Sequence, residues 1–205
     1  CEIFTDVEGI FTADPRIINS AKLIDEITYD EMLEMSSSGA GVLMARSVEF
    51  GRRYNVPIIV KSTFTNNKGT VVKEKTMEEA IVSGVTHNDK EVKFTLFGVP
   101  DQPGIAGTVF GSLSEIGTNV DMIVQNVSKE SITDISFTAP SEQQKDVEDT
   151  LKNISKQLDA KGYDVDENIA RISIIGAGMK SESGVASKMF KTCLLYTSDA
   201  ADDLL

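Results

Sequence analysis

The turn that reads DQPGIA, from Asp101 to Ala106, brings together groups that could bind a zwitterion. Apolar residues at helical spacing follow it, and the first amides of a helix lack acceptors and carry the positive end of its dipole. The amides around Gly104 can therefore receive a carboxylate. Asp101, or Asp121 on the following strand, offers a negative partner for an ammonium group. On residue types alone an alternative stays open, in which Asp101 only caps the helix and Asp121 only faces water.

A second segment with binding chemistry is TADPR, residues 12–16. Pro15 biases Asp14 away from the helical conformation, so we expect an extended segment that holds Arg16 in an exposed position. The planar guanidinium group can bond two oxygens at once, which suits a phosphate. A surface hairpin with a solvated arginine is the alternative interpretation, and it stays open on residue types alone.

Apolar periodicity predicts the elements that position the DQPGIA turn. Residues 92–97 alternate as a strand does, and the apolar residues after the turn recur at helical spacing until Gly117, which suits a left-handed helix end. Further elements complete the series: alternation at residues 119–127 and 132–137, a helix at 141–161 closed by Gly162, and a strand at 163–165. The order strand, helix, strand, strand, helix, strand is ferredoxin-like.

The first 72 residues predict a separate set of α and β elements. Thr28 and Glu31 have the spacing of a capping box, so a helix is expected to begin near Tyr29, with Met32 and Met35 buried. The other expected elements are strands at residues 1–4, 56–64 and 70–72 and a helix at 42–54. The charged residues 73–79 suggest a linker, and residues 80–86 are again typical of a strand.

The block FGVPDQPGIAGTVFGSLSEIGTNVDMIVQNVS, residues 97–128, resembles the first ACT domain of aspartokinases. These kinases phosphorylate aspartate at the head of lysine, threonine and methionine synthesis, and their equivalent residues bind feedback effector amino acids at a domain interface. The resemblance implies lysine and threonine as effectors. It implies an effector site made of Asp101, Gly104, Ile105, Ala106, Asn119, Val120, Asp121 and Gln125.

TDVEGIFTADPR, residues 5–16, resembles the aspartokinase segment TDVDGVYTADPR, which binds nucleotide in the second half of the amino-acid kinase fold. The resemblance implies that ATP, with Mg²⁺, is bound by Thr5, Asp6, Phe11, Thr12, Ala13, Asp14, Pro15 and Arg16. Phe11 stands where the family commonly has tyrosine. The family often shows GAKVLHPRSVE where this chain reads GAGVLMARSVE, so Gly41 takes the place of a lysine counted among the ATP contacts.

The resemblance predicts an α/β fold class: the C-terminal part of an amino-acid kinase fold, a ferredoxin-like βαββαβ ACT domain and a truncated second ACT domain. The expected divisions follow the chain: residues 1–75 for the kinase part, 80–90 for a strand of the second ACT domain, 92–166 for the first ACT domain, 169–190 for the start of the second, and 191–205 for a foreign or disordered tail. The chain opens on Cys1 within an apolar alternation, so we expect it to begin inside a larger protein.

Composition narrows the classes of partner. The chain has 20 basic and 32 acidic residues and a net charge of -12, which disfavours nucleic acid and anionic membrane surfaces. Its apolar runs are too short for a membrane span. Cys1 and Cys193 fit neither a metal nor a disulfide spacing, which favours a reducing, cytoplasmic location and gives no metal site.

The expected function is therefore that of an aspartate kinase fragment that transfers the γ-phosphoryl group of ATP to L-aspartate and gives 4-phospho-L-aspartate. Positioning and charge neutralisation carry such chemistry. The family's catalytic and aspartate-binding segments precede Cys1, so we assign no catalytic residue and expect the fragment alone to be inactive. We expect homo- or hetero-oligomers through ACT domains. Two alternatives remain: a non-catalytic regulatory subunit that binds amino acids, and part of an aspartokinase fused to homoserine dehydrogenase.

Overall fold

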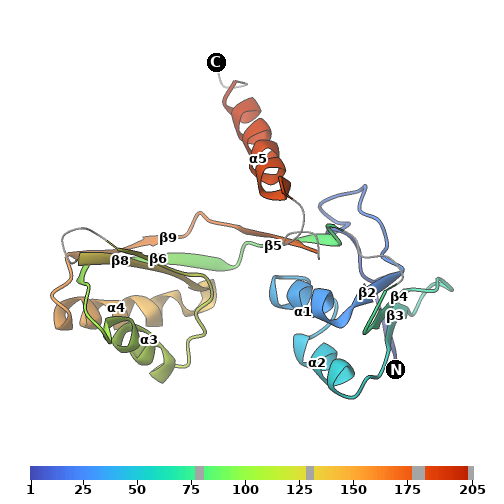
Figure 1. Ribbon diagram of the computed structural model, residues 1–205, viewed down its shortest axis with the longest axis horizontal. Coiled ribbons are helices and arrows are strands. Elements are labelled where there is room, and N and C mark those ends of the chain that lie inside the picture. The colour runs from blue at the N-terminus through green and yellow to red at the C-terminus, as the bar shows by residue number, and fades with distance from the viewer. Residues whose placement is uncertain (77–80, 128–131, 177–182, 203–205) are drawn as a thin grey trace. The chain divides into compact units, whose positions relative to one another are not determined.

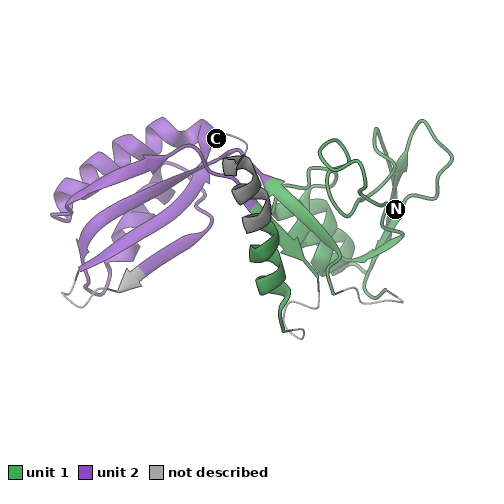
Figure 2. Cartoon of the chain, turned by 90° about the horizontal axis from the view of Figure 1, so that it is seen from above, with its two compact units in different colours: residues 1–87, 172–205 green, residues 88–171 purple. Residues whose placement is uncertain are grey.

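The computed structural model describes residues 1–76, 81–127, 132–176 and 183–202, and the chain forms two compact units. One unit comprises residues 1–87 together with 172–205, and the other comprises residues 88–171 (Figure 2). We call them the discontinuous unit and the inserted unit. Each contains one of the two segments with binding chemistry.

The inserted unit is a four-stranded antiparallel sheet with two helices on one face (Figure 1). The strand order is β7-β8-β6-β9. Along the chain the elements are β6 (Glu91–Pro100), α3 (Ile105–Glu115), β7 (Ile123–Val127), β8 (Ile132–Pro140), α4 (Gln144–Gln157) and β9 (Gly162–Asp166). The ferredoxin-like order predicted from the apolar periodicity is confirmed.

Apolar residues from both helices and the sheet form the core of the inserted unit. Val109 and Leu113 on α3 are fully buried, and so is the stripe of Val147, Leu151 and Ile154 on α4. Phe94 on β6 stacks on Phe137 of β8 with ring centroids 5.4 Å apart, while Phe110 meets Phe137 edge-on at 5.7 Å. The predicted helical spacing therefore does mark the core face of each helix.

Several element ends of the inserted unit differ from the predictions, and β6 and β8 each run three residues past the predicted ends at Phe97 and Phe137. The strand expected from residue 119 is regular only from Ile123, although the amide of Asp121 already donates to the carbonyl of Thr138 at 3.0 Å. Ser141 does not cap α4, because residues 141–143 form a 3-10 turn and the helix begins after Gln143 without a side-chain cap. At the other end α4 stops at Gln157, and Gly162 instead opens β9.

The discontinuous unit contains a mixed sheet of order β1-β3-β4-β2. Its strands are β1 (Glu2–Thr5), β2 (Glu26–Thr28), β3 (Ile58–Ser62) and β4 (Thr70–Lys73), and its first two helices are α1 (Tyr29–Ser37) and α2 (Ala45–Arg53). The capping box is confirmed: Glu31 and Thr28 exchange side-chain and backbone hydrogen bonds at the start of α1. Met32 and Met35 are buried as expected.

Two more strands, β5 (Gly84–Asn88) and β10 (Arg171–Ile175), pair with each other as a two-stranded ribbon. In the sequence, β5 comes before the inserted unit and β10 comes after it. Of the predicted start of the second ACT domain, residues 169–190, residues 177–182 lie outside the described residues. The last helix, α5, runs from Val185 to Asp202, where we expected disorder from residue 191 onward. None of the helices in the described ranges is long and apolar enough to cross a membrane.

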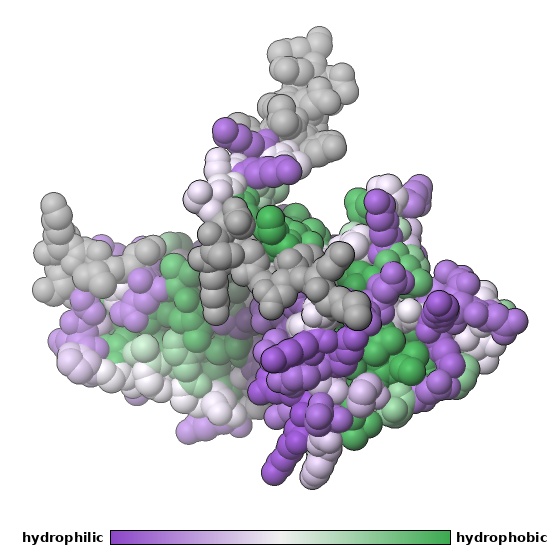
Figure 3. All heavy atoms as spheres, turned by 45° about the vertical axis from the view of Figure 1, so that its right-hand side comes forward, coloured by the Kyte–Doolittle hydropathy of each residue, from purple (hydrophilic) through white to green (hydrophobic). Residues whose placement is uncertain are grey.

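Figure 3 shows hydrophobic side chains gathered in patches between hydrophilic ones on the face that it presents. Several large apolar side chains are exposed, and three of them follow one another at the start of β7. Met122, Ile123 and Val124 are 53%, 51% and 47% exposed. Because β7 lies at the edge of its sheet, this apolar strand also presents unpaired backbone groups.

Candidate functional site

The start of α3 is open to a ligand. Its N-cap residue is Gly104, which has φ 95°, and no side chain caps the helix. Asp101 is exposed and does not cap α3, so that alternative interpretation is wrong. In the described residues the amides of Ala106 and Gly107 have no acceptor, while Ile105 donates weakly to the carbonyl of Gln102 at 3.3 Å. A Cβ atom at position 104 would meet no atom within 4 Å. The predicted carboxylate-binding amides are thus available.

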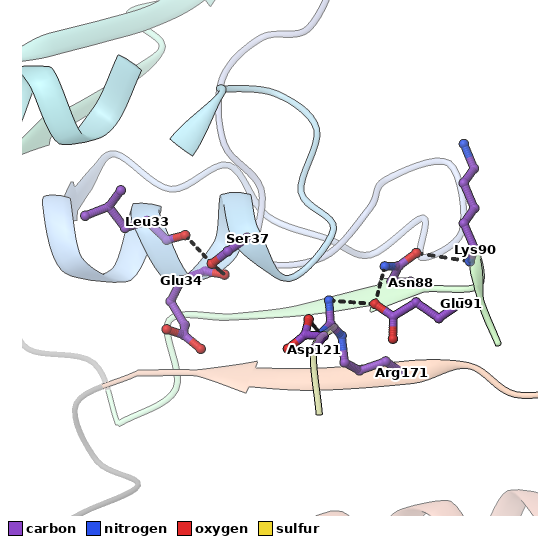
Figure 4. Close-up of polar contacts among 8 residues, drawn as sticks. All are labelled: Leu33, Glu34, Ser37, Asn88, Lys90, Glu91, Asp121 and Arg171. Carbon is purple, nitrogen blue, oxygen red and sulfur yellow. Dashed lines mark hydrogen bonds and ion pairs between the residues drawn. The ribbon is translucent and has the colours of Figure 1, made fainter. Parts of the chain in front are cut away.

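Asp121 does more than face water, because it belongs to a cluster of charged side chains (Figure 4). One terminal nitrogen of Arg171 donates to its carboxylate, and the other lies 3.0 Å from Glu91 Oε1. The amide of Asn88 also donates to Glu91 Oε1, at 2.8 Å. The side chains of Arg171 and Glu91 are only 12% and 8% exposed, whereas that of Asp121 is 55% exposed.

The charge of this cluster still favours an ammonium group. One arginine faces two carboxylates, which leaves a net charge of -1, and in the described residues Glu91 Oε2 is buried without a hydrogen-bond partner. Neither Arg171 nor Glu91 belongs to the residues predicted to bind an effector. Each is a charged residue at the start of an apolar strand, which could have marked it as a candidate. The two residues are distant in sequence, and only the pairing of strands brings them together.

The structure does not bring all eight predicted effector residues to one place. Pro100, just before Asp101, pairs with Ile132, whereas Asp121 bonds to Thr138, six residues further along β8. Six strand residues span about 20 Å. The 11 residues of α3 separate the same two groups by about 16 Å. Asp101, Gly104, Ile105 and Ala106 therefore lie at one end of the inserted unit and Asn119, Val120 and Asp121 at the other, with Gln125 on β7 between them.

The remaining members of the second group lie on the surface. Asn119 and Gln125 are exposed, and Val120 is partly buried against the core of the inserted unit. A hollow in the surface along the first turns of α4 contains none of the predicted residues. One amino acid cannot reach both groups within a single copy of the chain.

The TADPR segment begins as a short hairpin and ends in a turn. Thr12 donates its amide to the carbonyl of Lys22 at 2.9 Å, and Phe11 bridges to Leu23. Asp14 and Arg16 then close a turn in which Arg16 Nε and Nη2 donate to the Asp14 carboxylate at 3.0 and 2.7 Å. Arg16 is 87% exposed, as predicted, but its guanidinium group is held by a neighbouring carboxylate.

This contact controls the protonation of Asp14. The side-chain hydrogen bond from Arg16, assisted by the Arg16 amide, lowers the pKa of Asp14 from 3.8 to about 2. The same hydrogen bond raises the pKa of Arg16, and the nearby charge of Asp6 adds to the effect. A phosphate that takes the two donors of Arg16 has to displace Asp14 from them.

Thr5 ends β1 and Asp6 follows it, near enough to Arg16 for the charge of Asp6 to act on the guanidinium group. Thr5 donates its hydroxyl to Asp6 at 3.0 Å, and its carbonyl accepts from the amide of Thr63 at 2.8 Å. Gly41 is exposed with open space around it, so no side chain replaces the family's lysine there. The described residues contain no group of three or more His, Cys, Asp or Glu that could hold a metal ion.

Comparison with protein families matches both units. Residues 1–62 match the amino acid kinase family, and residues 93–159 match the ACT domain. The aspartate kinase of Pseudomonas fluorescens is 45% identical over 194 residues, which cover 93% of this chain and 47% of that protein. The chain thus spans about half the length of the curated relatives it matches.

Solved structures agree with these matches. E. coli aspartokinase III in complex with aspartate and ADP has a TM-score of 0.78 at 28% identity, over 93% of this chain and 43% of that one. The same enzyme in complex with lysine and aspartate has a TM-score of 0.67 at 28% identity, over 85% and 39%. The regulatory subunit of aspartate kinase from Thermus thermophilus has a TM-score of 0.51 at 34% identity, over 55% of this chain and 74% of that one. The chain therefore belongs to the aspartokinase family, with an amino-acid kinase part and an ACT domain.

Proposed function

We propose that this chain is part of an aspartate kinase that transfers the γ-phosphoryl group of ATP to the side-chain carboxylate of L-aspartate. The product is 4-phospho-L-aspartate, at the first step of lysine, threonine and methionine synthesis, in the cytoplasm. The similarity to an aspartate kinase along 93% of the chain supports this most directly. The activity is that of the complete protein, and we assign no catalytic residue to this chain.

In this proposal the segment from Thr5 to Arg16 binds the nucleotide. Arg16 is exposed and close to the carboxylates of Asp14 and Asp6, so a phosphate can take over its two donors by displacing Asp14. Mg²⁺ binds phosphate oxygens and keeps several waters, so it would accompany ATP. The E. coli relative, which was crystallised with aspartate and ADP, supports the nucleotide assignment.

We further propose that lysine, threonine or both regulate the enzyme through a site that two copies of the chain share. Antiparallel pairing of the edge strand β7 with β7 of a second copy would bring the Asp121 end of one copy beside the α3 start of the other. The register supports this, because Val127 pairs with Thr133 and Thr133 with Val99, close to Asp101. The amides at the α3 start would then hold the effector carboxylate, and Asp101 with the partner copy's aspartate would hold its ammonium group.

The amino acid kinase match over residues 1–62 favours part of a kinase over a separate regulatory subunit. A fusion to homoserine dehydrogenase is compatible with the same matches. The full reading frame on both sides of the chain decides between the three forms. We also propose the domain boundaries predicted from the sequence, in which β5 and β10 are strands of a second ACT domain.

The complete protein tests both proposals. It should release ADP in an aspartate-dependent manner, and the 205-residue chain alone should not. Asp101→Asn and Asp121→Asn should each weaken inhibition by lysine or threonine about ten- to a hundredfold, since a charge-assisted contact contributes about 1.5–3 kcal/mol. Asp149→Asn, an exposed carboxylate on α4, is the matched control and should leave inhibition unchanged.

A mixture of the two variants separates a shared site from a site within one copy. In a mixed dimer of Asp101→Asn and Asp121→Asn chains, a shared arrangement leaves one site with both aspartates intact and one with neither. Part of the activity should then be inhibited at the wild-type effector concentration. If mixed dimers are as insensitive as the two parent variants, the shared site is wrong.

A further inference from the structure

The ribbon of β5 and β10 is bonded to the backbone of the predicted nucleotide segment. Val85 on β5 donates its amide to the carbonyl of Thr12 at 2.8 Å, and Ser83 donates its amide to Ile175 of β10 at 2.7 Å. Thr12 also bonds to Lys22 through its amide and its hydroxyl, at 2.9 and 3.0 Å. Every polar group of Thr12 is thus engaged, and Val85 supplies the bond that comes from outside the hairpin.

Gly84 allows the ribbon to approach this closely. It is buried, and a Cβ atom built on it would lie 2.6 Å from Met35 Cε of α1 and 3.3 Å from the carbonyl oxygen of Thr12. A methyl group at this position would require the end of the Met35 side chain to move and the Thr12 carbonyl to give way by a few tenths of an ångström. The close approach of the strand to Thr12 is therefore favoured by the absence of a side chain.

Ser83, the residue before β5, ties the start of that strand to α1. Its hydroxyl donates to Glu31 Oε1, while Glu31 Oε2 accepts from the amide and hydroxyl of Thr28 at 3.0 and 2.7 Å. The capping box of α1 therefore also anchors the ribbon. From β10, Ile175 is 3% exposed in the apolar cluster that includes Met35.

We propose that Ser83, Gly84 and Val85 are positioning residues that hold Thr12, and so set the start of the turn that carries Asp14 and Arg16. Fixing the carbonyl of Thr12 fixes where that turn begins, and hence where the Arg16 guanidinium meets a phosphate. In the sequence, β5 leads into the inserted unit and β10 follows it, so the residues that hold Thr12 lie next to the boundary between the two units. This inference rests on the proposed nucleotide site.

Hydrogen exchange of the 205-residue chain tests the positioning without nucleotide or activity. Val85→Pro removes the amide that bonds to Thr12, and Val85→Ala keeps it. Amides of residues 8–16 should exchange about three- to tenfold faster in Val85→Pro than in Val85→Ala, as expected for the loss of one hydrogen bond. Equal exchange in the two variants would overturn the proposal whatever the protein's function is.

Kinetics of the complete protein test whether the ribbon's hold on Thr12 serves nucleotide binding. Ser83→Ala and Gly84→Ala should raise KM for ATP about three- to tenfold while kcat and KM for aspartate stay near their wild-type values. Gly111→Ala is the matched control for the glycine, because a methyl group on that exposed face of α3 meets no atom within 4 Å. If Gly84→Ala does not fold, the KM for ATP of Ser83→Ala alone tests whether the ribbon affects nucleotide binding.

An unchanged KM for ATP in Ser83→Ala, together with fast exchange at residues 8–16 in Val85→Pro, would show that the ribbon holds Thr12 without serving nucleotide binding, and would overturn the proposal. If the complete wild-type protein does not phosphorylate aspartate, the proposed function fails. The exchange experiment still decides whether the ribbon positions Thr12.

Discussion

Arg16 combines high exposure with a fixed partner. Its guanidinium group bonds to the Asp14 carboxylate through two nitrogens and is 87% exposed. Exposed ion pairs contribute little to folding stability, so the pair matters more for where the charges point than for the free energy of unfolding. An arginine already turned toward one anion is ready to accept another with little rearrangement.

The pKa of Asp14 reports this pairing. In the folded chain it should be about 2, and Arg16→Ala should return it toward 3.8. A depressed pKa means that the pairing stabilises the fold fully above pH 3.8 and that this contribution disappears as the pH falls through about 2. The pKa of Asp14 can be measured from its carboxyl carbon chemical shift by NMR between pH 1.5 and about 6. Arg53→Ala should leave the value unchanged, and a pKa that stays near 2 in Arg16→Ala would refute the assigned cause.

The sequence could indicate that Asp14, Arg16, Asp101 and Asp121 carry binding chemistry, but not their partners. Asp14 and Arg16 are two residues apart, so a turn was enough to join them. Arg171 lies 50 residues beyond Asp121, and only the folding of β6, β8 and β10 brings the two together. The charge of Asp121 is therefore shared with a buried arginine, which residue types alone could not show.

The ends of helices and strands could be predicted from the sequence where the signal is local. The capping box placed the start of α1 at Tyr29, and Gly117, with φ 73°, ends α3 as expected. The prediction failed for the start of α4, because Ser141 has the right residue type but its backbone forms a 3-10 turn. It also placed the start of β7 too early, since the chain after α3 must first cross to β8 before regular pairing begins at Ile123.

Alanine substitutions at Gly104 and Gly107, near the N-terminus of α3, should have opposite effects on the free energy of unfolding. Gly104 has φ 95°, where a Cβ atom costs about 1–2 kcal/mol, so Gly104→Ala should lower the free energy of unfolding by about that amount. Gly107, inside the same helix, has open space around it, so Gly107→Ala should stabilise by up to about 1 kcal/mol. Urea titrations followed by circular dichroism measure both. Equal effects would contradict a strained position 104.

The separation of the predicted effector residues into two groups could not be predicted from the sequence. The resemblance named the residues, and the register of β8 separates them by about 20 Å in one copy. Sequence spacing hid this, because Ala106 and Asn119 are close along the chain but stand at opposite ends of α3. The order of elements could be predicted from periodicity, whereas the distance across the unit required the strand register.

The exposed apolar edge should make the chain associate. Ile123 is 51% exposed on the edge strand β7, so Ile123→Lys should shift the chain toward monomer by placing a charge on that edge. Phe50→Lys on α2, where the side chain is 49% exposed, serves as the control and should not change the association. Sedimentation velocity at micromolar concentration distinguishes the species. Association that is equally strong in Ile123→Lys would place the contact elsewhere.

The pairing of β5 with β10 also sets the order in which the chain can fold during synthesis. Residues 88–171 are continuous and can fold as soon as they emerge, but the discontinuous unit waits for Ile175 to fill its place beside Met35. Since residue 175 follows residue 87 by 88 positions, ribosomes working at 5–20 residues per second leave that gap open for about 4 to 18 seconds. The segment around Thr12 is therefore among the last to reach its final packing, because β5 has no strand to pair with until β10 has emerged.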